Sequence, residues 1–87
     1  MSDLKSDFDI AVLASRKLTK TPSNAALLEL YALYKQATMG DVKDERPEGF
    51  DLVAAAKFDA WEDRRGMTRE DAMAAYIALV EHLHKGM

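Results

Sequence analysis

The stretch YALYKQATMGD, from Tyr31 to Asp41, combines helical spacing with a helix stop and decides how this chain folds. Tyr34 and Lys35 follow Tyr31 by three and four positions, so the three side chains are expected on one face of a helix. Gly40 is a natural stop for that helix. Two rings and a lysine in an acidic chain can stack on a flat group and meet a phosphate. By spacing alone, two core tyrosines beside a solvated lysine are the commoner case.

Apolar residues recur at helical spacing outward from this stretch in both directions, which predicts an all-α fold. Ser6 with Asp9, and Thr68 with Asp71, have the spacing of capping pairs at helix starts. Pro22 suits a first helical turn. We expect four helices, over residues of about 6–17, 22–38, 51–64 and 68–85.

The connections between these helices restrict the topology. The first and second helices, like the third and fourth, are joined by few residues, so each pair should run antiparallel. Residues 39–50 form a longer link that can reach roughly 40 Å, enough to return along a helix of about 25 Å, so helices two and three can be parallel. Its acids Asp41, Asp44, Glu45 and Glu48 are expected to be solvated.

Length and composition exclude several classes of protein. With 87 residues, the chain is expected to form one small domain. A net charge of −3 argues against a nucleic-acid binder, and the absence of cysteine excludes a disulfide framework. The longest apolar stretch, Ala25 to Tyr34, is interrupted by Glu29 and is too short to span a bilayer. With no signal-peptide run at the start, we expect a cytoplasmic protein.

Four motifs occur in a fixed order, and together they cover roughly residues 6–84. They are YALYKQATMGD, then ERP at 45–47, AKFDAW at 56–61 and EDAMAAYIALVE at 70–81. In order and separation they resemble the acyl-CoA-binding protein family. The resemblance implies a single acyl-CoA-binding domain over 1–87, folded as a four-helix bundle of up-down-down-up order. It also implies reversible binding of medium- to long-chain fatty acyl-CoA as a carrier, without catalysis or cofactor.

The same resemblance implies a set of ligand-binding residues. They are Arg16, Tyr31, Tyr34, Lys35, Lys57 and Tyr76. In the family, counterparts of Lys35 and Lys57 bind the 3′-phosphate region of coenzyme A, and a basic residue at the position of Arg16 helps to hold the nucleotide. Tyrosines at 31 and 34 contact the adenosine and its phosphate, and one at 76 lines the site.

The residues themselves leave an alternative open for several of these positions. Tyr76 falls in an apolar stripe with Val80 and Leu83, where a core role is the commoner one. Trp61 is also expected in the core. Val53 and Ala55 occupy positions where many family members have lysine or arginine, so fewer phosphate contacts are expected here.

Nothing in the sequence indicates catalysis or a metal site. His82 and His84 are two positions apart and cannot form a metal-binding pair on one helix face, so both are expected at the surface. No nucleophile with its base is recognisable from spacing, which disfavours a small thioesterase. The main alternative to a carrier is a helical protein–protein interaction module that does not bind acyl-CoA. We expect a monomer without membrane insertion whose partners are acyl-CoA and acyl-CoA-using enzymes.

Overall fold

The computed structural model describes residues 3–47 and 49–85, and the regular secondary structure in these ranges is entirely helical. The helices are α1 (Leu4–Ser15), α2 (Asn24–Met39), α3 (Leu52–Glu62) and α4 (Arg69–Lys85). The expected all-α fold is therefore confirmed, with helix ends within a few residues of those predicted. The loop acids Asp44 and Glu45 are exposed as expected, whereas Glu48 lies outside the described residues. Asp41 is also exposed, but it is not simply solvated, because it accepts two hydrogen bonds from the protein.

The prediction that Ser6 and Asp9 cap α1 is wrong. Asp3 is the N-cap, because its Oδ1 accepts a hydrogen bond of 2.7 Å from the Ser6 backbone nitrogen. Asp9 lies further along the helix, where it forms an exposed ion pair of 2.9 Å with Lys5. The helix thus begins about half a turn earlier than expected, since an aspartate caps a helix start as well as a serine does.

The other helix boundaries follow simple caps. Ser23 caps α2 by accepting from the Ala26 nitrogen, so Pro22 precedes the helix instead of lying in its first turn. Thr68 caps the start of α4 by accepting from the Asp71 nitrogen at 3.0 Å, as predicted. Gly40 ends α2 with a φ of 78°, in the left-handed region that favours glycine.

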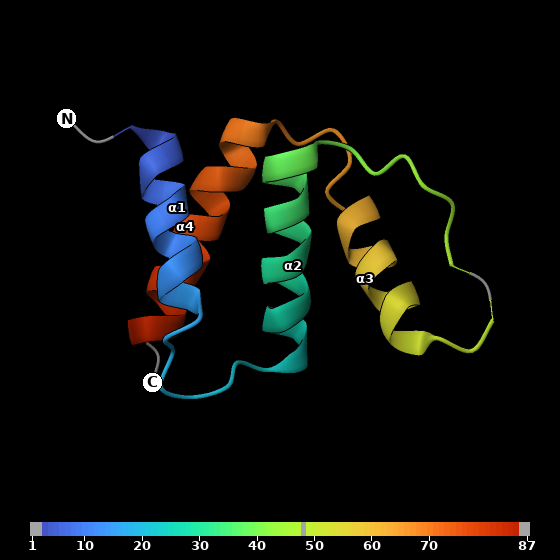
Figure 1. Ribbon diagram of the computed structural model, residues 1–87, viewed down its shortest axis with the longest axis horizontal. Coiled ribbons are helices and arrows are strands. Elements are labelled where there is room, and N and C mark those ends of the chain that lie inside the picture. Colours follow the sequence, from blue (N-terminus) through green and yellow to red (C-terminus); the bar gives the residue numbers. More distant parts are fainter. Residues whose placement is uncertain (1–2, 48, 86–87) are drawn as a thin grey trace.

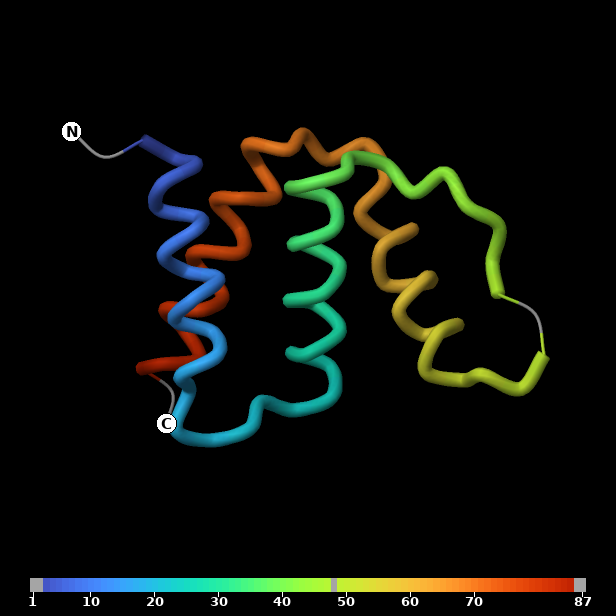
Figure 2. Tube along the Cα trace, viewed as in Figure 1, coloured from blue at the N-terminus to red at the C-terminus, as the bar shows by residue number. Residues whose placement is uncertain are grey.

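The helices run in up-down-down-up order, as Figure 1 shows. Helices α1 and α4 run in one direction, and α2 and α3 in the other. The helix pairs that pack together are α1 with α4, α4 with α2, and α2 with α3. The chain between α2 and α3 passes along the outer side of α3 (Figure 2). This long link lets α2 and α3 lie parallel and side by side.

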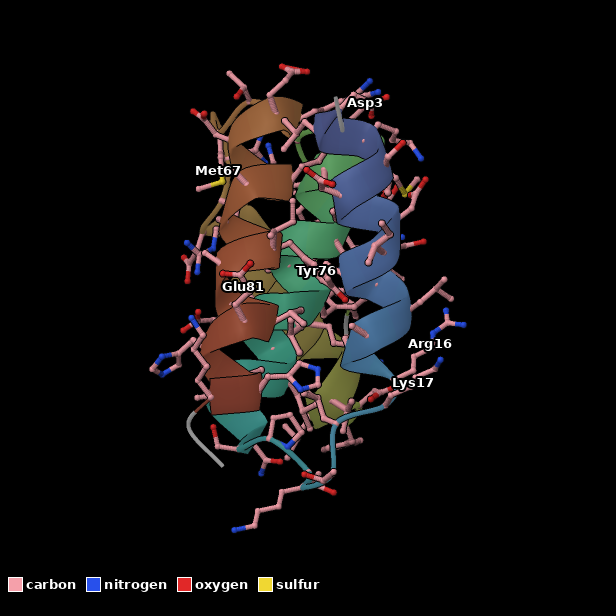
Figure 3. All side chains as sticks on the ribbon, turned by 90° about the vertical axis from the view of Figure 1, so that its left-hand side faces the viewer. Asp3, Arg16, Lys17, Met67, Tyr76 and Glu81 are labelled. Atoms are coloured by element: carbon pink, nitrogen blue, oxygen red, sulfur yellow. The ribbon has the colours of Figure 1, made fainter. Side chains whose placement is uncertain are left out.

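The main hydrophobic core lies between α1, α2 and α4. Its buried residues are Phe8, Ala11, Leu30, Leu33, Ala37, Ala72, Tyr76 and Val80. Figure 3 shows Tyr76 between α4 and α1, with Arg16, Lys17 and Glu81 toward the outside. Helix α3 contributes one buried residue, Trp61. The seam between α2 and α3 is therefore held by less buried surface than the three-helix core.

Polar groups at the end of YALYKQATMGD tie α2 to the turn between α3 and α4. The fully buried Gln36 donates from Nε2 to Asp41 Oδ1 and to the Met67 carbonyl oxygen, both at 2.8 Å. The Gly66 nitrogen also donates to Asp41 Oδ1 at 2.8 Å. These two donors, first Gly66 and then Gln36, lower the pKa of the Asp41 carboxyl by stabilising its charged form. The motif thus fixes where the fourth helix begins.

Candidate functional site

Helix α2 supplies three of the predicted site residues, and the structure separates them onto two sides. Tyr34 faces α1 and α4, where its ring stacks on Phe8 with centroids 6.0 Å apart and an interplanar angle of 27°. Tyr31 and Lys35 meet residues of α3. The expected single face was wrong because Tyr34 and Lys35, being adjacent, point about 100° apart around the helix.

The ring cluster beside Tyr34 is built mainly as core. Tyr76 is buried, and its ring meets Phe8 edge-on at a centroid distance of 5.2 Å. The Tyr76 hydroxyl donates to Ser15 Oγ at 3.1 Å, and Ser15 Oγ donates to the Val12 carbonyl oxygen at 2.7 Å. Tyr34, by contrast, is 39% exposed. Of these rings, Tyr34 is the one open to a ligand.

Arg16 lies near Tyr34. It follows the last residue of α1, is exposed, and lines with Tyr34 a hollow of about 360 Å³ between α1 and α2. The walls of this hollow include both charged and apolar side chains. A flat ring beside a guanidinium suits a nucleobase and its phosphate, because the ring can stack and the guanidinium can pair.

The seam between α2 and α3 contains two lysine–ring pairs. In one pair the lysine belongs to α3 and the ring to α2, and in the other the lysine belongs to α2 and the ring to α3. Lys57 of α3 places Nζ 5.3 Å from the centroid of the Tyr31 ring of α2. Lys35 of α2 places Nζ 5.2 Å from the ring centroid of Trp61 of α3. Such cation–π contacts contribute about 0.5–1 kcal/mol at exposed sites. Each of these two lysines therefore places its ammonium group against the neighbouring helix. Both ammonium groups have N–H donors that an anion can use.

Two grooves meet at the Tyr31–Lys57 pair. The first, which we call the apolar groove, has a volume of about 390 Å³. Its lining residues are Asn24, Leu27, Leu28, Tyr31, Leu52, Val53, Ala56 and Lys57. The second, of about 310 Å³, lies toward the loop residues Asp44 and Glu45 and also has Tyr31 and Lys57 in its wall. This pair therefore stands where the apolar groove meets a second groove whose wall includes two carboxylates.

Sequence reasoning missed the walls of the apolar groove. Leu27 precedes Tyr31 by four positions, and Val53 precedes Lys57 by four, so helical spacing would have placed each beside its partner. From the sequence, Val53 is expected only to lack a charge contact with the ligand. In the structure it lines the groove, where an apolar side chain adds to the wall.

Other expectations concern residues that were not predicted to touch the ligand. Trp61 is buried as predicted, and its Nε1 donates to the Gly40 carbonyl oxygen at 2.9 Å. His82 and His84 are exposed, as predicted. Within residues 3–47 and 49–85, no group of His, Cys, Asp or Glu is arranged to hold a metal ion. In the same ranges, no helix has the length and apolar character needed to cross a membrane.

Comparison with known proteins gives a consistent picture. The family model described as acyl CoA binding protein matches residues 5–80. The chain is 47% identical over 76 residues to acyl-CoA-binding protein homolog 1 of Caenorhabditis elegans, covering 87% of this chain and 88% of that protein. It is 51% identical over 81 residues to the acyl-CoA-binding protein homolog of Manduca sexta, covering 92% and 90%.

Solved structures agree with the sequence relatives. The fold is similar to the crystal structure of Oryza sativa acyl-CoA-binding protein 2, with a TM-score of 0.92, 40% identity and coverage of 97% of this chain and 93% of that one. It is also similar to the crystal structure of ACBP from Moniliophthora perniciosa, with a TM-score of 0.88 and 36% identity. That match covers 99% of this chain and 83% of the other one. The chain therefore belongs to the acyl-CoA-binding protein family.

Proposed function

We propose that this chain binds medium- to long-chain fatty acyl-CoA thioesters reversibly and carries them in solution without catalysing a reaction. The observation behind the proposal is the Tyr31–Lys57 pair, which joins a cationic group to the end of the apolar groove. A fatty acyl-CoA has the matching form, an anionic headgroup with a long apolar chain. Family membership supports the same ligand class.

The headgroup would be held by groups on both sides of α2. Lys35 and Lys57 offer ammonium groups to the 3′-phosphate region, and the Tyr31 hydroxyl can donate to the same phosphate. On the other side of α2, Tyr34 offers a partly exposed ring for the adenine, and Arg16 offers a guanidinium. Tyr76 would act indirectly, because it packs against Tyr34 and its hydroxyl is bonded to Ser15.

The acyl chain would lie in the apolar groove between α2 and α3. The volume of that groove falls in the range of about 300–1,000 Å³ that small-molecule sites occupy. Burial at about 0.8 kcal/mol per methylene gives a sixteen-carbon chain roughly 10 kcal/mol at most, before ordering costs. A hydrogen bond to a charged group adds only about 1.5–3 kcal/mol. Chain burial therefore sets the affinity, and the cationic groups select coenzyme A.

Binding of this kind would give the protein a role as a carrier. A bound thioester would have its chain hidden from water, so that a soluble pool is available to enzymes that use acyl-CoA. We propose that the chain does this as a monomer in the cytoplasm. The site residues would bind the ligand by hydrogen bonds, ion pairs and ring stacking, and no chemical step is assigned to them.

Titration calorimetry with a series of ligands tests this proposal. Affinity should rise steeply with acyl-chain length and level off once the groove is full, while free coenzyme A binds weakly. A free fatty acid of the same length should bind less tightly than its coenzyme A ester, because it satisfies the groove and not the lysines. Equal affinity for acetyl-CoA and palmitoyl-CoA would contradict the proposal. Absence of heat with any coenzyme A ester would favour the interaction module instead.

A further inference from the structure

A further groove lies between α1 and α4, and the proposed ligand does not use it. Its volume of about 490 Å³ is larger than that of the hollow beside Arg16 or of either groove at the Tyr31–Lys57 pair. We call it the α1–α4 groove. None of its lining residues lines those other three spaces. The α1–α4 groove therefore stays accessible when acyl-CoA fills the proposed site.

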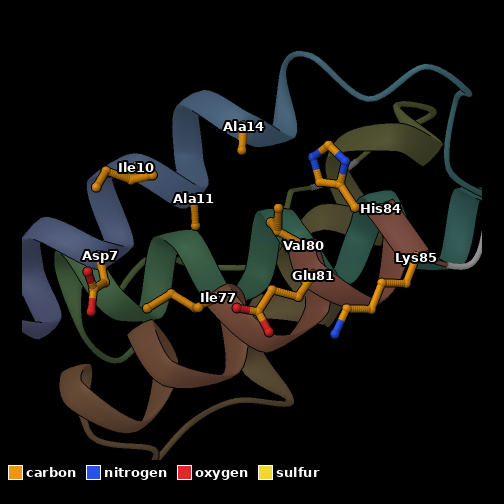
Figure 4. Close-up of a pocket in the computed structure, with 9 residues that line it drawn as sticks. All are labelled: Asp7, Ile10, Ala11, Ala14, Ile77, Val80, Glu81, His84 and Lys85. Carbon is orange, nitrogen blue, oxygen red and sulfur yellow. The ribbon is translucent and has the colours of Figure 1, made fainter.

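The floor of the α1–α4 groove is apolar, and small side chains give it depth. Ala11 and Ala14 project from α1 toward α4, where Ile77 and Val80 lie opposite them (Figure 4). Ala11 and Val80 are buried, whereas Ile10, at the edge of the groove, is 64% exposed. Alanines leave holes into which side chains of another element can insert.

Both walls of the α1–α4 groove have the spacing with which helices pack on one another. The α1 wall consists of residues 7, 10, 11 and 14, and the α4 wall includes residues 77, 80, 81 and 84. Each set follows the i, i+3, i+4, i+7 pattern. Because α1 and α4 run in the same direction (Figure 1), the two walls form parallel rows. From residue 7 to residue 14 the row is about 10 Å long, or two helical turns. Such rows fit a third helix, whereas a small ligand needs no repeat.

The charges of the α1–α4 groove differ between its two ends. Asp7 of α1 lies at one end, and Lys85 of α4 lies at the other, beside His84 (Figure 4). Glu81, one turn before Lys85, adds a carboxylate to the α4 wall. A helix that begins with acidic residues and ends with basic ones matches this order if it runs antiparallel to α4. That charge order also stabilises the helix itself, because it compensates the helix dipole.

We propose that the α1–α4 groove docks an amphipathic helix of a partner protein, with the acidic start of that helix at Lys85 and its basic end toward Asp7. The helix buries an apolar stripe of i, i+3, i+4, i+7 spacing over the alanines of α1 and Val80 of α4. This goes beyond the proposed function and requires no acyl-CoA. Because the groove and the proposed ligand site share no lining residue, a loaded carrier docks without releasing its ligand.

Two synthetic peptides of about 18 residues are the probes, since shorter helices are marginal in water. The stripe peptide has leucines at i, i+3, i+4, i+7 spacing, glutamates in its first turn and lysines in its last turn. The alternating peptide has the same composition, with its leucines at every second position, and so has no helical stripe. Calorimetry measures the binding of each peptide to the full chain, with and without palmitoyl-CoA.

Ile10→Ser removes an exposed apolar side chain from the groove. Phe50→Ser is the matched control, since Phe50 is 101% exposed and lines none of the four spaces. We expect the stripe peptide to bind the parent and Phe50→Ser equally, with or without palmitoyl-CoA. Ile10→Ser should bind it about fivefold more weakly or worse. Its circular dichroism spectrum and its affinity for palmitoyl-CoA should be those of the parent.

Three calorimetric results would overturn the proposal. They are no binding of the stripe peptide by the parent, equal binding of the two peptides, and equal binding of the stripe peptide by the parent and Ile10→Ser. A parent dimer that Ile10→Ser lacks, seen by sedimentation equilibrium, would also overturn it, because a second copy would then cover the groove. Failure of the proposed function is distinguishable, since the peptides are also titrated into ligand-free protein.

A nitroxide label on the first residue of the stripe peptide tests its direction. The label should broaden the amide NMR signals of His84 and Lys85 more than the signal of Asp7. Stronger broadening at Asp7 would overturn the charge match on which the proposed partner depends.

Discussion

The two sides of α2 use the same kind of ring in different surroundings. Toward α1 and α4, Tyr34 packs against Phe8 and Tyr76, so rings meet rings. Toward α3, Tyr31 lies under the ammonium group of Lys57. The two tyrosines are three residues apart, and sequence gives no reason to treat them differently. The surroundings therefore distinguish a ring packed among other rings from a ring paired with a cation.

This difference also divides the molecule energetically. The side toward α1 and α4 contains most of the buried residues, and there the Tyr76 hydroxyl is bonded within the protein, to Ser15. The side toward α3 has open grooves and two lysines whose N–H donors are available. Substitutions of buried residues on the first side should mainly change stability, and substitutions of the lysines on the second should mainly change ligand affinity.

The largest expected effect is on the packed side. Phe8→Ala removes a fully buried ring that touches both Tyr34 and Tyr76, and should lower the free energy of unfolding by about 3–5 kcal/mol. Urea denaturation followed by circular dichroism measures this loss. A loss below about 1 kcal/mol would mean that the ring cluster is not the structural side of α2.

The next effect is on the lysine side. Lys57→Ala should weaken palmitoyl-CoA binding by about 1–3 kcal/mol, because it removes the proposed charge-assisted bond to phosphate, and should leave stability nearly unchanged. The weakening should shrink at high salt. Lys85→Ala, at the exposed end of α4, is the matched control and should bind like the parent. Equal binding by both variants would remove Lys57 from the site.

Two hydroxyl deletions sharpen the comparison. Tyr31→Phe should cost about 0.5–1.5 kcal/mol of ligand affinity, because its hydroxyl is proposed to meet phosphate. Tyr76→Phe should leave affinity unchanged and cost a similar amount of stability, because it breaks the bond to Ser15. Calorimetry and urea denaturation on both variants give the four values needed. The reverse pattern would exchange the roles of the two sides.

The smallest expected effect concerns the turn that joins the two sides. The bonds from Gly66 and Gln36 lower the pKa of Asp41 in the folded protein. Because this pKa is lower in the folded than in the unfolded protein, the ionised carboxylate stabilises the fold at pH values above the pKa of the unfolded state. That contribution is lost as the pH falls and the carboxyl is protonated, so it fades below about pH 4. Asp41→Asn keeps an acceptor oxygen without the charge. The stability difference between parent and Asp41→Asn should shrink between pH 6 and pH 3, whereas a constant difference would show that ionisation of Asp41 does not matter.

Much of the fold was predictable because it depends on local signals. Gly40 ends α2 and Thr68 starts α4 through geometry that neighbouring residues determine. The cap of α1 was misplaced because Asp3 and Ser6 are both good caps, and spacing alone does not choose between them. The up-down-down-up order came from the family resemblance, since loop lengths permitted it without requiring it.

The candidate site was less predictable because it depends on how helices meet. Spacing grouped Tyr31, Tyr34 and Lys35, but the position of α3 decides which of them faces a groove. Leu27 and Leu28 could not be distinguished from core leucines, because an apolar groove wall and a core have the same helical periodicity. Tertiary packing is needed to tell an open seam from a closed one.

The central claim is that the seam between α2 and α3 holds the phosphate end of the ligand. Its most direct test is calorimetry of parent and Lys57→Ala with palmitoyl-CoA and with the analogue that lacks the 3′-phosphate. If Lys57 meets this phosphate, the substitution weakens palmitoyl-CoA binding by about 1–3 kcal/mol and has little effect on the analogue. If Lys57→Ala weakens both ligands equally, the phosphate lies elsewhere and the claim is contradicted.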